Sequence, residues 1–168
     1  MNQRTPLTLA LFLLGSIPSL APVAAQNKSP QDKPVASNGE QVKKFEAAIA
    51  PYVKKARESL PEAKKKYLAG LPKNQIFYVT IKLYDSSKTY EQVFVRVTSW
   101  KGESIQGILA SGLSIVHNHS KGEELTCHES EILDWTISKP DGTEEGNFVG
   151  KFLDVVPPAN LDSQGLVF

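Results

Sequence analysis

The sequence predicts an α+β domain in which an N-terminal helix, interrupted at proline, packs on a twisted antiparallel sheet of about five to six strands. Two observations predict this class. Before residue 70, apolar residues recur three or four positions apart, which is the period of a helix. After residue 75, they alternate with polar residues in short segments separated by turn residues, which is typical of hairpin-connected strands. A strong twist in such a sheet favours curling towards a small barrel.

Residues 1–25 have the layout of a secretory signal peptide. Arg4 lies near the start, an apolar run follows from Leu7 to Leu20, and small residues precede a cleavage site before Gln26. The apolar run is shorter than the roughly 20 residues that a membrane-spanning helix needs. We therefore expect a periplasmic or secreted mature chain without a transmembrane segment.

The charge of the mature chain is balanced overall but unevenly distributed. The 19 Lys and Arg residues less Arg4 leave 18, which equals the 18 Asp and Glu residues, and this balance argues against a nucleic-acid partner. Residues 40–70 are mainly basic and residues 101–147 mainly acidic. This polarity favours a solvated helix face. The alternatives are attraction between the two halves within the fold and a weak contact of the basic helix with a membrane surface.

The polar residues 26–39 contain two prolines and predict a disordered leader before a single domain at 40–156. The helical period then runs to Ala69, and Gly70 is placed to end the helix. Pro51 and Pro61 fall inside this run, where proline removes a backbone donor, so we expect a kink or a fresh helix start at each.

Three strands should follow as an antiparallel meander, at residues 75–84, 90–100 and 105–110. In the second, alternation puts Val93, Val95 and Val97 on one face and Phe94, Arg96 and Trp100 on the other. Gly107 indicates a bulge or a close neighbour.

Shorter elements complete the predicted domain. We expect strands at 113–116, 124–128 and 132–138, a turn at 140–143, one more paired segment at 152–156, and a loose C-terminal tail at 157–168. Cys127 is the only cysteine, so it cannot form an intramolecular disulfide, and we interpret it as a buried small hydrophobic residue unless it bridges two chains. No phosphate-binding glycine loop is present, and no cofactor is expected.

A set of spaced residues in the second half resembles the bacterial family known as domain of unknown function 2314. These residues are Glu91-x-x-Phe94-Val95-x-Val97, Trp100 with Gly102, Gly107-x-Leu109-Ala110, Gly122, Ile132-x-Asp134-Trp135 and Gly146-Asn147-Phe148. The family pattern usually has tryptophan at position 94 and Asn-Asp-Pro after Ala110, where this chain has Phe94 and Ser111-Gly112-Leu113. The resemblance implies a small α+β domain with no established activity, substrate or cofactor.

The residues favour a non-catalytic binding module for a protein, a peptide or an envelope component. Aromatic side chains on the less buried face of a sheet are typical of binding surfaces. Five residues are the candidates for this contact: Phe94, Arg96, Trp100, Asp134 and Trp135. Trp135 lies in an apolar run, so burial in the core is the competing interpretation.

Two other functions are possible on sequence grounds. The first is a metal site at His117 and His119 with His128 or Cys127, because residues two apart on an extended chain point the same way. The second is a hydrolase that uses the carboxyl groups of Glu131 and Asp134 beside Trp135. Polar turns commonly contain solvated acids, and an Asp before a buried Trp commonly accepts backbone hydrogen bonds, so we expect binding rather than catalysis.

Overall fold

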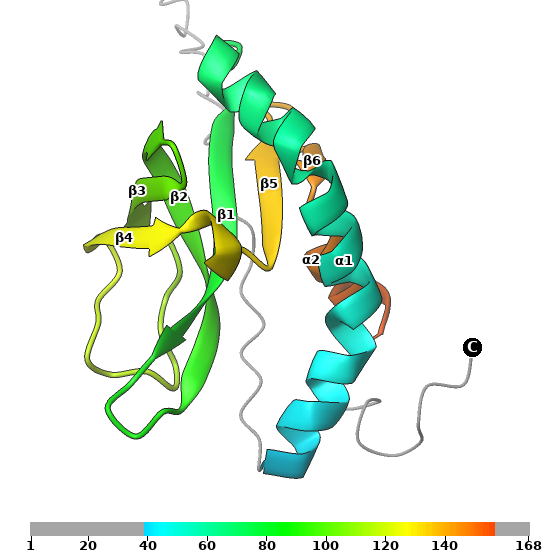
Figure 1. Ribbon diagram of the computed structural model, residues 1–168, viewed down its shortest axis with the longest axis vertical. Helices are drawn as coiled ribbons and strands as arrows, with labels where there is room; N and C mark the ends of the chain where they lie inside the picture. Colours follow the sequence, from blue (N-terminus) through cyan, green and yellow to red (C-terminus); the bar gives the residue numbers. More distant parts are fainter. Residues whose placement is uncertain (1–38, 157–168) are drawn as a thin grey trace, which may run out of the picture.

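The computed structural model describes residues 39–156, which form one α+β unit (Figure 1). The predicted signal peptide, leader residues 26–38 and the predicted C-terminal tail lie outside the described residues. In chain order the elements are α1 (Gly39–Ala69), β1 (Ile76–Tyr84), β2 (Tyr90–Lys101), β3 (Ser104–Leu109), β4 (Glu124–His128), the short 3-10 helix η1 (Glu129–Glu131), β5 (Asp134–Ser138), β6 (Glu144–Gly146) and α2 (Phe148–Val155). Neither described α-helix is long and apolar enough to cross a membrane.

The helix α1 is continuous across both of its prolines, which excludes fresh helix starts at Pro51 and Pro61. Both prolines are exposed, as are Ala47 and Arg57, whose carbonyl groups would otherwise receive the missing N–H bonds. Water can therefore satisfy these carbonyls. The helix ends at Ala69, and the next residue, Gly70, adopts a positive φ of 92° as expected for a C-terminal cap.

The six strands form one open antiparallel sheet in the order β4-β3-β2-β1-β5-β6. The predicted meander of β1, β2 and β3 is confirmed. Gly107 is required by a close neighbour, because a Cβ atom there would lie 2.5 Å from the carbonyl oxygen of Arg96. The sheet does not close, so the expectation of a barrel is wrong. The edge strands are β4 at one side and the three-residue β6 at the other.

One face of the sheet, which we call the helix-covered face, packs against the second half of α1 (Figure 1). The sheet supplies alternating apolar residues, and α1 supplies Ala56, Leu60 and Ala63. The first half of α1 instead packs on α2, through Phe45, Ala48 and Ile49. The apolar side of α1 is thus core, as its pattern indicates, and α1 joins two separate clusters of buried residues.

Three features of the second half differ from the predictions. Residues 113–116 form no strand, because the backbone N–H groups of Ser114, Ile115 and Val116 donate to the buried carboxylate of Glu91 instead of to a neighbouring strand. Residues 152–156 do not pair with the sheet, since 148–155 form α2, in which Val149, Phe152 and Leu153 share one buried side. The strand β6 was not predicted.

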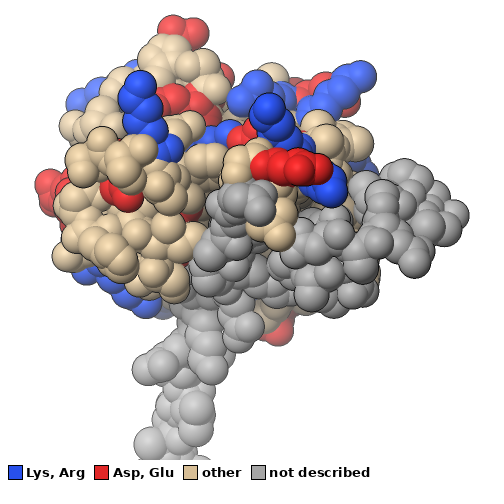
Figure 2. Space-filling view, turned by 90° about the horizontal axis from the view of Figure 1, so that it is seen from below, with Lys and Arg blue, Asp and Glu red and all other residues tan. Residues whose placement is uncertain are grey.

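The charge polarity seen in the sequence joins distant segments of the fold. Lys64 pairs with Glu129 and Lys66 pairs with Glu145, so the basic helix contacts the acidic second half of the chain. On the face shown in Figure 2, basic and acidic side chains lie next to one another rather than in separate patches. Attraction between the two halves within the fold is therefore one use of the uneven charge.

Candidate functional site

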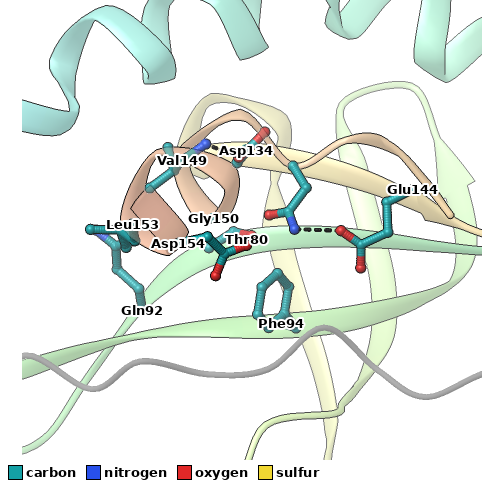
Figure 3. A pocket seen from close by; sticks show the side chains of 10 residues that line it. Thr80, Gln92, Phe94, Asp134, Glu144, Val149, Gly150, Leu153 and Asp154 are labelled. Atoms are coloured by element: carbon teal, nitrogen blue, oxygen red, sulfur yellow. Dashed lines mark hydrogen bonds between the residues drawn. The ribbon is translucent and has the colours of Figure 1, made fainter. Parts of the chain in front are cut away.

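A pocket of about 240 Å³ lies between α2, the start of β6 and the sheet face opposite to the helix-covered one (Figure 3). We call it the α2 pocket. It is lined by Thr80, Gln92, Phe94, Asp134, Glu144, Asn147, Val149, Gly150, Leu153 and Asp154. These residues come from five elements and the junction before α2, so the pocket exists only when the second half of the chain has folded onto the meander.

The floor of the α2 pocket is a row of side chains across three strands. Thr80 of β1 pairs with Phe94 of β2 on one side and with Asp134 of β5 on the other. All three side chains point away from the helix-covered face, because their neighbours Val79, Val95 and Trp135 belong to the core beneath α1. Phe94 is 8% exposed and contacts Tyr78 edge to face, with 6.5 Å between ring centroids.

The carboxyl group of Asp134 fixes the start of α2. Its Oδ1 accepts a hydrogen bond of 2.8 Å from the backbone N–H of Trp135, and its Oδ2 accepts one of 2.7 Å from that of Val149. Burial raises the pKa of Asp134 to about 7, against the opposing effect of these backbone donors and of Lys151. The side chain is 1% exposed and both of its oxygens are engaged, so it acts as a helix cap.

Two glycines shape the wall of the pocket around Asn147. A Cβ atom on Gly146 would lie 2.2 Å from the carbonyl oxygen of Trp135, so only glycine allows β6 to pass so close. Asn147 adopts a left-handed φ of 54°, and a Cβ atom on Gly150 would lie 2.1 Å from its Oδ1. The Nδ2 of Asn147 donates to Oε2 of Glu144 at 2.6 Å (Figure 3).

One polar atom of the pocket lacks a partner. The Nε2 of Gln92 is buried and makes no hydrogen bond with any part of the chain that the structure describes. An unpaired buried donor costs about 1–3 kcal/mol, so such atoms are uncommon unless a ligand or water satisfies them.

The five residues predicted as binding candidates separate into three groups. Phe94 and Asp134 meet in the α2 pocket. Arg96 follows Phe94 on the same side of β2, is exposed, and lines a second, open depression of about 540 Å³ beside Tyr67 and Leu71. Trp100 and Trp135 belong to the core under α1.

The placement of Trp100 differs from the predicted alternation. The pairing of β2 with β3 shifts between Val97 and Ser99, and this irregularity turns Trp100 to the helix-covered face. There it is 5% exposed, contacts Phe77 with 5.8 Å between ring centroids, and donates from Nε1 to Glu129. Its side chain therefore does not share a surface with Phe94.

Trp135 is a core residue, in agreement with the competing interpretation of its sequence. Its Nε1 donates to the carbonyl oxygen of Ala56 and to Oγ of Ser59, both at 3.1 Å. Phe148 packs edge to face on its ring. The Asp-Trp and Gly-Asn-Phe motifs thus belong to one structural unit that attaches α2 to the sheet and to α1.

The histidines predicted as metal ligands do not come together. His119 contacts Glu123 within its own loop, and His128 contacts Ser130 and Glu103 at the end of β4. Across residues 39–156 no group of three His, Cys, Asp or Glu side chains could hold a metal ion. Cys127 lies in the core, and burial raises its pKa to about 11, which keeps it a neutral thiol.

The carboxyl groups proposed for a hydrolase are also separate. Glu131 is exposed, and its Oε2 accepts the backbone N–H of His128 at the start of η1. It does not line the α2 pocket, where Asp134 lies. Glu131 and Asp134 thus each cap a different helix, and their carboxyl groups do not meet as the predicted pair.

Several residues of the pocket were missed by sequence reasoning, among them Gln92, Glu144, Asn147 and Asp154. The spacing of Val149, Phe152 and Leu153 was the available signal, since residues at i, i+3 and i+4 fit a helix. A helix beginning after Asn147 would have placed Asp154 on the same element as Val149 and Leu153.

The fold and the pocket define a class: a small α+β domain with a side-chain-sized pocket on the sheet face that α1 does not cover. Residues 43–155 match the family model described as "Uncharacterized protein conserved in bacteria (DUF2314)". The chain belongs to this bacterial family, as the spaced motifs indicate. No curated protein and no solved structure matches the chain.

Proposed function

We propose that this protein is a non-catalytic binding module that holds part of a protein, peptide or envelope component in the α2 pocket. One observation carries the proposal: the pocket is lined by Gln92, whose buried Nε2 has no partner among the described residues, and by the ring of Phe94. A concave site with an apolar floor and a few polar groups that converge on it is typical of ligand sites. A ligand acceptor at Gln92 would remove the cost of the unpaired donor.

The hydrogen bonds of the Asp134 carboxyl group favour binding over catalysis in this pocket. Asp134 is buried, and both of its oxygens accept backbone N–H groups. A general acid or base needs an oxygen within reach of the substrate. Asp134 therefore supports the pocket rather than reacting in it.

The proposed location is the periplasm or the exterior of the cell, with a mature chain that begins at Gln26. The support is the Arg4, apolar-run and small-residue layout of residues 1–25. Expression of the full chain in a bacterial host tests this directly. A periplasmic or culture-medium product whose N-terminal sequence begins at Gln26 is expected, and an uncleaved cytoplasmic product would contradict it.

Peptide-pool binding tests the proposed function. Four pools of blocked hexapeptides, each with Lys, Glu, Gln or Leu fixed at one position, are titrated against ¹⁵N-labelled protein. We expect saturable shifts of pocket resonances with at least one pool. In the Gln92→Leu variant the shifts should weaken, whereas the matched Gln106→Leu variant, changed at an exposed glutamine of β3, should behave as wild type. Failure of all four pools to shift pocket resonances would contradict the proposal.

A further inference from the structure

The side chains of the α2 pocket leave it electronegative. Glu144 and Asp154 place carboxyl groups at its wall, and no Lys or Arg of residues 39–156 lines it. Asp134 adds little charge, because burial raises its pKa to about 7. Lys151 does not line the pocket, because its Nζ donates to the backbone carbonyl oxygens of Glu144 at 3.2 Å and of Gly146 at 2.7 Å, and its charge acts on the buried Asp134. A concave site lined by one sign of charge concentrates ligands of the other sign.

An aromatic ring lies between two of these carboxyl groups. Figure 3 shows Phe94 at the floor, with Glu144 to one side and Asp154 to the other. The Oε2 of Glu144 accepts from Asn147, and its second oxygen makes no hydrogen bond within residues 39–156. An ammonium or guanidinium group over an aromatic face within about 6 Å is attracted by the ring quadrupole, and a carboxylate oxygen beside it adds a charge-assisted hydrogen bond.

The size of the pocket limits the ligand to one side chain. Its volume of about 240 Å³ is below the ~300–1,000 Å³ typical of sites that enclose a whole small molecule. A metal ion does not fit the arrangement either, because the described residues offer no three ligating groups at one point. An organic cation at the end of a flexible side chain is small enough for the pocket and needs no set of three ligating groups.

Gln92 supplies an observation that is independent of the acidic groups. Its buried Nε2 donor requires an acceptor, which a simple amine lacks and a peptide backbone carbonyl provides. A cationic side chain with its own backbone carbonyl therefore brings a positive charge to the acidic wall and the ring of Phe94, and an acceptor to the amide of Gln92.

We propose that the α2 pocket recognises a Lys or Arg side chain of a peptide, with the cation over Phe94 between Glu144 and Asp154 and the peptide carbonyl at Gln92. This inference rests on the binding function proposed above and names the ligand chemistry of that same site. The contact is a side-chain anchor, so the remainder of the peptide lies outside the pocket.

Blocked pentapeptides with a single variable residue test the ligand chemistry. The probes are Ala-Ala-X-Ala-Ala with X as Lys, Arg, norleucine or Glu, and norleucine matches the length of the Lys stem without its charge. We expect the Lys and Arg peptides to bind at least tenfold more tightly than the norleucine peptide, the Glu peptide to bind more weakly still, and affinity for Lys to fall with added salt.

Two adjacent residues of β6 provide a matched pair of variants. Glu144 lines the pocket, whereas Glu145 pairs with Lys66 of α1. Glu144→Gln keeps an acceptor for Asn147 but removes the charge, and it should weaken Lys-peptide binding at least fivefold while leaving norleucine-peptide binding unchanged. Glu145→Gln should change neither.

The outcomes separate this inference from the proposed function. Equal binding of the Lys and norleucine peptides, or no effect of Glu144→Gln on Lys binding, would overturn the cation inference and leave the binding function standing. Pocket shifts with none of these pentapeptides at about 10 mM would also overturn the cation inference. If the four hexapeptide pools fail as well, the proposed function itself is contradicted.

Discussion

The two faces of the sheet differ in how they satisfy their polar atoms. On the helix-covered face, the indole nitrogens of Trp100 and Trp135 both find acceptors, and the remaining side chains are mostly apolar. On the opposite face, Gln92 Nε2 and Thr136 Oγ1 are buried without a partner among the described residues. Within residues 39–156, no buried side-chain nitrogen or oxygen of the first face lacks a partner. The second leaves one donor unpaired inside a pocket, which is why we assign ligand binding to it.

Truncation of Trp135, which lies on the helix-covered face, should give the largest loss of stability. Trp135→Ala removes a buried ring that contacts Phe77 and Phe148 and donates to Ala56. We expect the free energy of unfolding to fall by ~3–5 kcal/mol in urea denaturation. Arg96→Ala, at an exposed site of the opposite face, should change it by less than ~0.5 kcal/mol. If Trp135→Ala and Arg96→Ala lost similar amounts of unfolding free energy, the helix-covered face would not be the more important one for stability.

Stability should depend on pH through Asp134. Its pKa is about 7 in the folded chain and ~3.9 when unfolded, so the folded state retains a proton that the unfolded state releases between these values. This contribution is complete below about pH 4 and is lost as the pH rises through 7, by up to ~4 kcal/mol. Urea unfolding of wild type and Asp134→Asn across this range measures it. The stability advantage of wild type over the variant should shrink as pH rises, and a constant advantage would contradict the assignment.

The carboxylate of Glu91 is a buried polar group whose hydrogen-bond donors lie within the described residues, and replacing it tests how much these bonds stabilise the fold. Glu91→Gln replaces a carboxylate oxygen by a donor that faces the N–H groups of Ser114 and Ile115. We expect a loss of ~1.5–3 kcal/mol in unfolding free energy and faster amide exchange across 114–116. The exposed Glu124→Gln serves as the control and should be neutral. Unchanged exchange in the Glu91 variant would show that the loop is held by other contacts.

Gln92 should show the smallest effect, and with the opposite sign. Gln92→Leu removes the unpaired buried amide nitrogen, so the free energy of unfolding should stay the same or rise by ~0.5–1 kcal/mol. Thermal and urea unfolding measure this change. A clear loss of stability would mean that Gln92 serves the fold rather than a ligand.

The helix-covered face was largely predictable because its residues follow simple periods. Alternation in β1 and β2 placed Phe77, Val79 and Val95 correctly in the core. Local pattern could not place Trp100, because the register shift that turns it depends on pairing with β3. Nor could it show that Pro51 and Pro61 are tolerated, which depends on their exposure in α1.

The pocket was predictable only in part because its residues meet through long-range contacts. Phe94 and Asp134 were candidates from their sequence context, and Thr80 joins them through strand pairing. Glu144 and Asp154 flank Phe94 only because Asp134 caps α2 and Gly146 passes close to Trp135. The apolar run at 152–156 fitted a strand as well as a helix, and the cap that decides between them lies 15 residues away in sequence.

The most direct test of the contrast between the faces is a map of ¹⁵N–¹H shifts during titration with the Ala-Ala-Lys-Ala-Ala peptide. We predict saturable changes at Gln92, Phe94, Asn147 and Gly150, while the indole signals of Trp100 and Trp135 stay in place. Changes centred on the indoles, or spread evenly over both faces, would contradict the assignment of ligand binding to the α2 pocket.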